Sequence, residues 1–375
     1  MRSLSTRHTA SCIVPSDSDF STLGSRESTP YNPLKKPQNL RSQKGLARKR
    51  GSAPKERQNL SVDPFYASAI FFLGLAFGSF LNVCIYRLPL GLSVVTPRSA
   101  CPACKRPIAF YDTLPVLSWL ILRGRCRHCQ GRISPRYLVI EMLTAFLFLG
   151  CYAYFGFTLA TLKYCVFGFL LLGLIFTDAE TKLLPDNLTL LGLALGGLFS
   201  FVVPVHDLAS QFLPGVVNLP FSNEIAAPLF SVLDSLLGAA VGASFIYGAG
   251  AAYLRWRGTE GMGFGDVKLM AMVGAFLGVK LTIFTIFAAS LAGSLFGLAT
   301  VLVVWIKRRK RFMRRAALQT KKRPNELSPR ERAWRSAQMV YRNYQMPFGV
   351  FLGSMALVAL FFGNQFLNWY GRFWW

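Results

Sequence analysis

Residues 69–86 read AIFFLGLAFGSFLNVCIY, a run of 18 residues without a charged side chain. A transmembrane helix needs about 20 mostly apolar residues to cross the hydrocarbon core of a bilayer. The run therefore predicts a first membrane-spanning helix within 61–89. Comparable apolar runs occur at 138–156, 160–177, 187–204, 228–254, 266–279, 281–306 and 347–365. Together they predict an all-α integral membrane protein, a polytopic helical bundle of about eight transmembrane helices.

The composition of the whole chain agrees with a membrane fold. Its 375 residues are 52% hydrophobic and only 16% charged, and the mean hydropathy is +0.36. These values exclude a disordered protein and a collagen-like fibre, and they are too apolar for an ordinary soluble globule. The 42 Lys and Arg residues against 17 Asp and Glu give a formal net charge of +25. Because the cations lie between apolar runs, we expect contact with membrane lipid and no nucleic-acid partner.

The distribution of cations predicts how the chain is oriented in the membrane. The segments 90–136, 255–265 and 307–346 are basic, whereas 205–226 contains no Lys or Arg. With eight spans the three basic segments share one side, which is cytoplasmic by the positive-inside rule. The basic tail 1–60 then falls on the other side. Either this tail is translocated despite its charge, or the natural start lies further downstream, and we favour the downstream start.

These features divide the chain into six segments. The first 60 residues carry 12 Lys or Arg and no apolar period, which predicts disorder. The segment before the last span holds 14 Lys or Arg, and we favour a solvated loop there over a partially helical segment on the membrane surface. The predicted segments are a disordered basic tail (1–60), the first transmembrane helix (61–89), a small cytoplasmic zinc-binding loop domain (90–136), a transmembrane core (137–306), a basic cytoplasmic loop (307–346) and the last transmembrane helix with the C-terminus (347–375).

Four of the eight cysteines form two close pairs, Cys101-Pro-Ala-Cys104 and Cys126-Arg-His-Cys129, separated by 21 residues. Two such pairs can place four thiolates in a tetrahedron around one zinc ion. Disulfides and free thiols are the alternatives, and a cytoplasmic location disfavours disulfides. Because four thiolates fill the coordination shell, we expect a closed, structural zinc site. His128 could replace one of the thiolates, although a lone histidine at such a place is more often solvated.

Two aspartates lie at matching ends of predicted spans. Asp178 ends the third span, and Asp266 begins the sixth after a glycine-rich stretch. An ionisable residue at membrane depth is a functional candidate by default. Two aspartates that meet can share a proton, so that one activates water and the other polarises a peptide carbonyl. The pattern predicts hydrolysis of a peptide bond, whereas the alternative for Asp266 is an ordinary helix N-cap.

Three further residues are candidates for supporting roles. Gly263 and Gly265 precede Asp266 and lack a Cβ atom, so the backbone can approach this aspartate closely or adopt a positive φ. An extended substrate strand could then lie beside it. Glu141 lies one turn into the second predicted span. It either pairs with a basic group or lines the site, and the sequence leaves both options open.

The order of the motifs along 66–306 and 346–365 resembles that of the type IV prepilin peptidases, the bacterial GxGD aspartic proteases. Each motif alone is weak, but the ordered set is highly specific. The motifs are Gly78-Ser79-Phe80-Leu81-Asn82-Val83, the two CxxC pairs, Pro135-Arg136-Tyr137 leading to Glu141, Asp178 through Leu184-Pro185-Asp186, Gly263-Phe264-Gly265-Asp266-Val267-Lys268-Leu269, and Pro347-Phe348-Gly349.

The resemblance implies a function for the chain. It implies that Asp178 and Asp266 are the catalytic pair, and that the substrates are type IV prepilins and secretion-system pseudopilins. Their basic leaders would be removed after a Gly at the cytoplasmic face of the bacterial inner membrane. In the family the cysteine loop marks members that also methylate the new N-terminus with S-adenosylmethionine, so we expect methylation. No glycine-rich nucleotide fingerprint locates the methyl donor.

The chain also departs from the family pattern, and other functions stay open. Glu180 stands where many members have a second aspartate, and neither the 1–60 tail nor so long a 307–346 insertion is typical. One alternative is a peptidase that does not methylate. Others are an ion or proton transporter, which would need acids near the bilayer midplane, and a non-catalytic pilus or secretion assembly protein, which would not require either aspartate.

Overall fold

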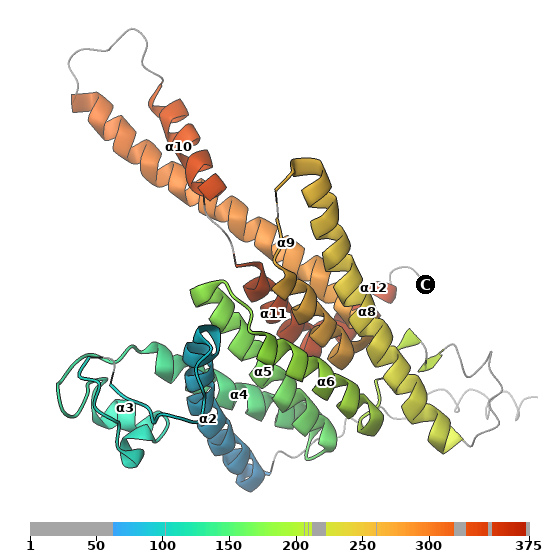
Figure 1. Cartoon of the computed structure of the whole chain (residues 1–375). Helices are drawn as coiled ribbons and strands as arrows, with labels where there is room; N and C mark the ends of the chain where they lie inside the picture. The colour runs from blue at the N-terminus through green and yellow to red at the C-terminus, as the bar shows by residue number, and fades with distance from the viewer. Residues whose placement is uncertain are drawn as a thin grey trace, which may run out of the picture. The chain divides into compact units, whose positions relative to one another are not determined.

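The computed structural model describes residues 63–372 except 102, 206, 209, 212–222, 260, 319–327 and 344–346. The tail 1–60, for which the sequence predicts disorder, lies outside the described residues. Within them the regular structure is helical, and six helical segments are long and apolar enough to cross a membrane. This confirms the all-α, polytopic membrane fold. The main helices (Figure 1) are α2 (Pro64–Arg87), α4 (Arg136–Phe155), α5 (Leu159–Thr181), α6 (Asp186–Val202), α8 (Asn223–Arg257), α9 (Phe264–Leu318), α10 (Pro329–Asn343), α11 (Phe348–Val358) and α12 (Asn364–Gly371).

All eight predicted spans are helical, although six segments meet the length and apolarity expected of a crossing helix. Helix α9 contains two of the predicted spans, 266–279 and 281–306, and it is broken between them at Gly278, where φ is 78° and ψ is −178°. Helix α6 corresponds to the predicted span 187–204 but has 17 residues, or about 26 Å of helix. It is therefore shorter than a typical hydrocarbon core of about 30 Å.

The first span begins at a well-defined cap and packs through small residues. The side chain of Asp63 accepts a hydrogen bond of 2.9 Å from the backbone N–H of Phe65, and Pro64 occupies the first helical position. A Cβ atom on Gly78 would lie 2.6 Å from the Cα atom of Glu141 on α4. Gly74 meets Ala145 in the same way. The two glycines therefore allow α2 and α4 to pack backbone against backbone.

Helices α8 and α9 approach one another even more closely. A Cβ atom on Gly274 would lie 2.0 Å from the carbonyl oxygen of Gly238, so any larger residue would force the two helices apart. Next to this contact the rings of Phe167 and Phe276 stack with centroids 4.7 Å apart. Both rings are buried in the core formed by α5, α9 and their neighbours. This core fixes the positions of the ends of α5 and α9, where the two aspartates lie.

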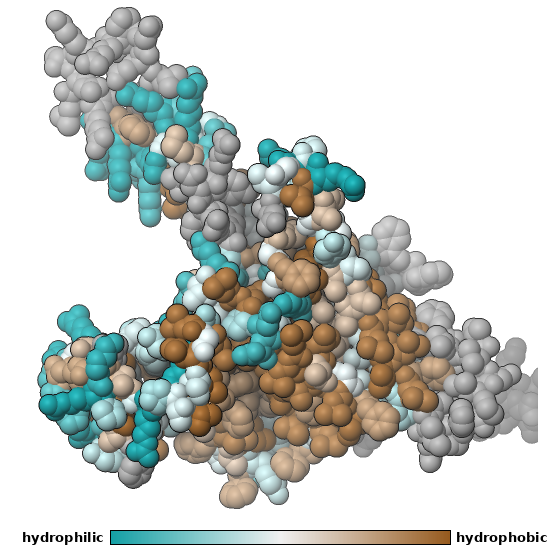
Figure 2. All heavy atoms as spheres, viewed as in Figure 1, coloured by the Kyte–Doolittle hydropathy of each residue, from teal (hydrophilic) through white to brown (hydrophobic). Residues whose placement is uncertain are grey.

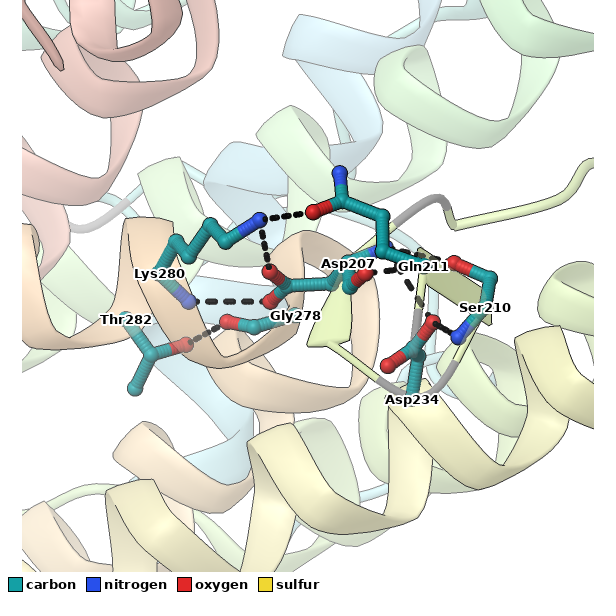
Figure 3. A network of polar contacts seen from close by, with 7 residues as sticks. All are labelled: Asp207, Ser210, Gln211, Asp234, Gly278, Lys280 and Thr282. Atoms are coloured by element: carbon teal, nitrogen blue, oxygen red, sulfur yellow. Dashed lines mark hydrogen bonds and ion pairs between the residues drawn. The ribbon is translucent and has the colours of Figure 1, made fainter. Parts of the chain in front are cut away.

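A polar network lies at the end of the bundle opposite the two aspartates (Figure 3). The carboxylate of Asp207 accepts a hydrogen bond of 2.9 Å from the backbone N–H of Lys280, just after the break at Gly278. The ammonium group of Lys280 lies 3.4 Å from the same carboxylate. Buried Asp234 on α8 accepts hydrogen bonds from the backbone N–H groups of Asp207 and Ser210, at 3.1 and 3.0 Å. The network therefore caps the second part of α9 and ties it to α8.

The segment 307–346, for which the sequence favours a solvated loop, contains two helical stretches. Helix α9 continues to Leu318, and α10 packs against it, as Figure 1 shows. Ala333 on α10 is fully buried, and Arg308 on α9 approaches the carbonyl oxygen of Ser336 at 3.5 Å. Packing of α10 against α9 around buried Ala333 therefore accounts for helical structure in this basic segment.

Candidate active site

The structure brings Asp178 and Asp266 to one point of the bundle. Asp178 lies in the last turn of α5 and Asp266 in the first turn of α9, and both side chains are buried. The first turn of α11 lies against both of them. A methyl group built on Gly349 would be 2.8 Å from Oδ2 of Asp178 and 3.3 Å from Oδ1 of Asp266. The ends of three helices, distant in sequence, thus hold the two carboxylates close enough to interact electrostatically.

Helix α11 directs its N-terminus at Asp178. The helix begins at Phe348 after Pro347, and the backbone N–H of Val350 donates a hydrogen bond of 2.9 Å to Oδ2 of Asp178. The first N–H groups of a helix have no partner within the helix and carry its positive dipole end. They are therefore suited to stabilising a carboxylate. The sequence pattern pointed to Gly349 only as part of a motif, and this contact with Asp178 was not predicted.

The two glycines before Asp266 act by close approach and not by unusual dihedral angles. Neither residue has a positive φ. A Cβ atom on Gly265 would lie 2.9 Å from the Cβ atom of Leu184, so the start of α9 packs tightly on the chain that follows α5. The backbone N–H of Gly263 faces the carboxylate of Asp266. The glycines thus position Asp266 through the backbone.

An ion pair reinforces the same contact between the two motifs. The ammonium group of Lys268, one turn into α9, lies 2.6 Å from Oδ1 of Asp186 at the start of α6. The pair is partly exposed, so its main effect is to fix the register of two chain segments and not to add much stability. On α5, Glu180 forms an ion pair with Arg136 at the start of α4.

Glu141 connects the membrane bundle to the cysteine loop. Its buried Oε2 atom accepts a hydrogen bond of 2.7 Å from the backbone N–H of Val116, and Ser79 on α2 also donates to it. Val116 has a φ of 60°, a strained value for a β-branched residue. The sequence left open whether Glu141 pairs with a basic group or lines the site, and in the structure it accepts hydrogen bonds from loop backbone and a hydroxyl group.

The four cysteines of the loop converge on one point. Their Sγ atoms all lie within 4.8 Å of one another, and those of Cys101 and Cys129 are 3.8 Å apart. A tetrahedral zinc site with Zn–S bonds of about 2.3 Å has edges of about 3.8 Å, so the spacing fits such an ion. None of the four forms a disulfide in the structure, and His128 is exposed outside the cluster.

The two cysteine pairs have the same backbone turn. The N–H of Cys101 bonds to the carbonyl oxygen of Arg106, and that of Cys126 bonds to the carbonyl oxygen of Gly131. In each turn the residue after the second cysteine has a positive φ, 58° at Lys105 and 56° at Gln130. Backbone hydrogen bonds from Cys104 and Ala103, together with neighbouring thiols, lower the pKa of Cys101 to about 6 despite its burial. The convergence of the four sulfur atoms allows them to act as thiolate ligands of one metal ion.

Two arginines stabilise the remainder of the loop through hydrogen bonds. Buried Arg87 at the end of α2 donates hydrogen bonds to the carbonyl oxygens of Ser93 and Pro97, at 2.9 and 2.6 Å. Arg127 forms two hydrogen bonds with the carboxylate of Asp112, at 2.9 and 2.6 Å, and this partner holds the pKa of Asp112 below its usual value. These contacts order the loop around the cysteines.

Comparison with known proteins identifies the relatives of this arrangement. Residues 72–155 match the model of the bacterial peptidase A24 N-terminal domain, and residues 165–298 match that of the type IV leader peptidase family. The chain is also 30% identical over 329 residues to the prepilin leader peptidase/N-methyltransferase of Aeromonas hydrophila, an alignment that covers 81% of this chain and 93% of the relative. The chain belongs to the type IV leader peptidase family.

Other members of the family are similar to shorter parts of the chain. The proteins of the same name from Myxococcus xanthus and Neisseria gonorrhoeae are 36% and 35% identical to it, over 64% and 63% of this chain. These alignments cover 64% and 82% of the respective relatives. No solved structure matches the chain. Both aspartates lie in the second family-model match and the cysteine cluster in the first, whereas 307–346 lies outside both.

Proposed function

We propose that this chain is a membrane aspartic endopeptidase that removes the leader from type IV prepilins and pseudopilins and then methylates the new N-terminus. The observation that carries the proposal is the meeting of Asp178 and Asp266 beside Gly349 at one end of the bundle. The names of the relatives, prepilin leader peptidase/N-methyltransferase, support both activities. The family supports a multi-pass protein of the bacterial inner membrane.

The geometry gives the two aspartates different roles in the proposed reaction. Asp178, which accepts the N–H of Val350 at the start of α11, acts as the ionised partner. It takes a proton from water while the water oxygen bonds to the carbonyl carbon of the peptide. Asp266 carries the shared proton and donates it to the carbonyl oxygen. Collapse of the tetrahedral intermediate then breaks the C–N bond, as Asp178 passes its proton to the departing amine and Asp266 takes back a proton from a hydroxyl group of the intermediate.

The proposed site faces the cytoplasm. The segments beside it, 90–136 and 255–265, are rich in Lys and Arg, which remain on the cytoplasmic side of bacterial inner membranes. The carboxylates lie at helix ends, so an extended leader can reach them from water. A position at the end of the spans favours access for a peptide over ion transport across the midplane.

The cysteine cluster is the proposed site of a structural zinc ion. Cys101, Cys104, Cys126 and Cys129 would hold the ion and thereby cross-link the two turns of the loop. S-adenosylmethionine is the proposed methyl donor, and it would supply an electrophilic methyl group to the new amine. We assign no residues to the donor.

The test of the proposed function is cleavage of a prepilin from the same genome by the purified full-length chain in lipid nanodiscs. Mass spectrometry of the product is expected to give a loss equal to the leader, ending after a Gly. One additional methyl mass is expected only when S-adenosylmethionine is present. An intact substrate after incubation with well-folded protein would contradict the peptidase, and cleavage without the methyl mass would leave a peptidase that does not methylate.

Removal of two thiols is expected to remove the metal. The double variant Cys101→Ser/Cys104→Ser should lower bound zinc from about one ion per chain to nearly none, because two ligands cannot hold a structural zinc ion. Bound metal is measured by mass spectrometry of the digested protein. His128→Ala is the matched control and should retain its zinc, since His128 is exposed outside the cluster. Full zinc content in the double variant would disprove the four-thiolate site.

A further inference from the structure

The helical segment that the proposed catalysis does not use is strongly basic. It consists of residues 307–318 of α9 together with α10, and we call it the basic hairpin. Figure 2 shows hydrophilic side chains gathered over this region, which projects away from the apolar surface of the bundle. Among its described side chains the exposed acid is Glu331. The exposed cations are Lys307, Lys310, Arg311, Arg314, Arg330 and Arg335.

The basic hairpin begins where α9 leaves the apolar part of its span. The apolar run ends at Ile306, and the next five residues, 307–311, are all cations. Trp305 immediately precedes this boundary, and the guanidinium group of Arg309 lies 5.4 Å from its ring centre. Tryptophan next to cations is typical of the level of the lipid headgroups. The base of the basic hairpin therefore lies at that level.

Helix α10 folds back along α9 and so returns toward the same level. The guanidinium group of Arg332 lies 5.8 Å from the ring centre of Phe312, and Arg308 approaches Ser336. Between the two helices is a shallow cavity of about 290 Å³ that is open to the surface. It is lined by Trp305, Arg330, Glu331, Trp334 and Arg335. The surface of the cavity is mainly apolar and includes two indole rings, which suits the glycerol and upper acyl chain of a lipid. The two arginines that line it carry guanidinium groups, which suit a phosphate.

We propose that the basic hairpin binds the phosphodiester headgroups of anionic phospholipids in the leaflet next to the two aspartates. Charge complementarity favours this partner, because the described part of the hairpin exposes six cations and one acid, and the cytoplasmic leaflet is anionic. Because the hairpin continues directly from the spanning part of α9, it lies next to that surface without the help of another protein. Nucleic acid has the same phosphodiester chemistry. However, the membrane places lipid headgroups next to Trp305 and does not place nucleic acid there.

Hydrogen exchange of α10 in the full-length chain tests the proposal. The chain is placed in nanodiscs of phosphatidylcholine, either pure or with about 30% phosphatidylglycerol. Exchange in residues 329–343 is expected to be at least about threefold slower in the anionic discs. The slowing should disappear in about 0.5 M NaCl, where electrostatic attraction to the surface is screened. Equal exchange in the two kinds of disc would overturn the proposal.

Matched variants separate this site from general surface charge. Arg330→Gln/Arg335→Gln removes the two guanidinium groups of the cavity and is expected to abolish most of the slowing. Arg255→Gln/Arg257→Gln removes the same charge from exposed positions at the end of α8 and should leave it unchanged. Equal loss in both variants would overturn a specific site. Protection by an added oligonucleotide in pure phosphatidylcholine discs, without protection by phosphatidylglycerol, would also overturn the lipid assignment.

Discussion

Asp178→Asn and Asp266→Asn are each expected to abolish leader cleavage, with a loss of at least about 1,000-fold in kcat/KM. An amide can neither accept the proton of the attacking water nor donate an acidic proton to the carbonyl oxygen. The two carboxylates act as one unit, so the double variant should be no worse than either single variant. Product formation is followed by mass spectrometry over a time course.

Folding controls make this prediction specific to the chemistry. Asparagine has nearly the shape of aspartate, so each variant should keep the thermal unfolding midpoint of the parent chain in detergent within a few degrees. Asp63→Asn is the matched change, because Asp63 caps α2 away from the site and asparagine is also a good N-cap. It should cleave at the parental rate. Cleavage by either site variant at a rate near that of the parent would rule out an aspartic mechanism.

Gly349→Ala should reduce cleavage by at least about 100-fold, because one methyl group would occupy the space between the two carboxylates. The methyl carbon would lie 2.8 Å from Oδ2 of Asp178 and 3.3 Å from Oδ1 of Asp266. Gly349 belongs to the first turn of α11, whose N–H groups face Asp178, so the helix cannot move away without losing the hydrogen bond from Val350. The loss should appear mainly in kcat, since the methyl group disturbs the reacting groups and not the leader's remote contacts.

The outcome for Gly349 can be separated from a loss of stability. Alanine is a better helix former than glycine, so helix propensity alone would stabilise α11. Gly248→Ala on α8 is the matched control, because a Cβ atom there has no neighbour within 4 Å. This variant should cleave normally. If Gly349→Ala also cleaves normally, the carboxylates do not react in the positions in which α11 holds them.

The spans and the cysteine cluster could be predicted because each depends on a local pattern. An apolar run such as 69–86 has few structures available to it in a bilayer, since every backbone polar group must be paired. Likewise, the CxxC spacing of Cys101 and Cys104 is a local pattern that predicts two thiols aimed at one point, and the structure brings these thiols together. The sequence predicted separate spans at 266–279 and 281–306 with uncertain ends, and the break at Gly278 lies next to the boundary between them.

Contacts between residues that are distant in sequence were not predicted. The bond between Val350 and Asp178 joins residues 172 positions apart, and no local signal specifies where the start of α11 will point. The bond from Val116 to Glu141 requires a strained backbone that propensity would not suggest. The arginines of α10 favoured the prediction of a solvated loop. The helix nevertheless buries Ala333 against α9, and this contact cannot be read from the local sequence.

The anchoring of the cysteine loop has a consequence for the history of such chains. Arg87 and Glu141, which hold the loop, belong to α2 and α4, whereas the two aspartates and Gly349 belong to α5, α9 and α11. A lineage could therefore delete the loop and inherit an intact pair of aspartates. Such a deletion would take away the backbone donor of a buried carboxylate, which is costly. Descendants without the loop should accordingly have replaced the acid at the position of Glu141 with an uncharged residue.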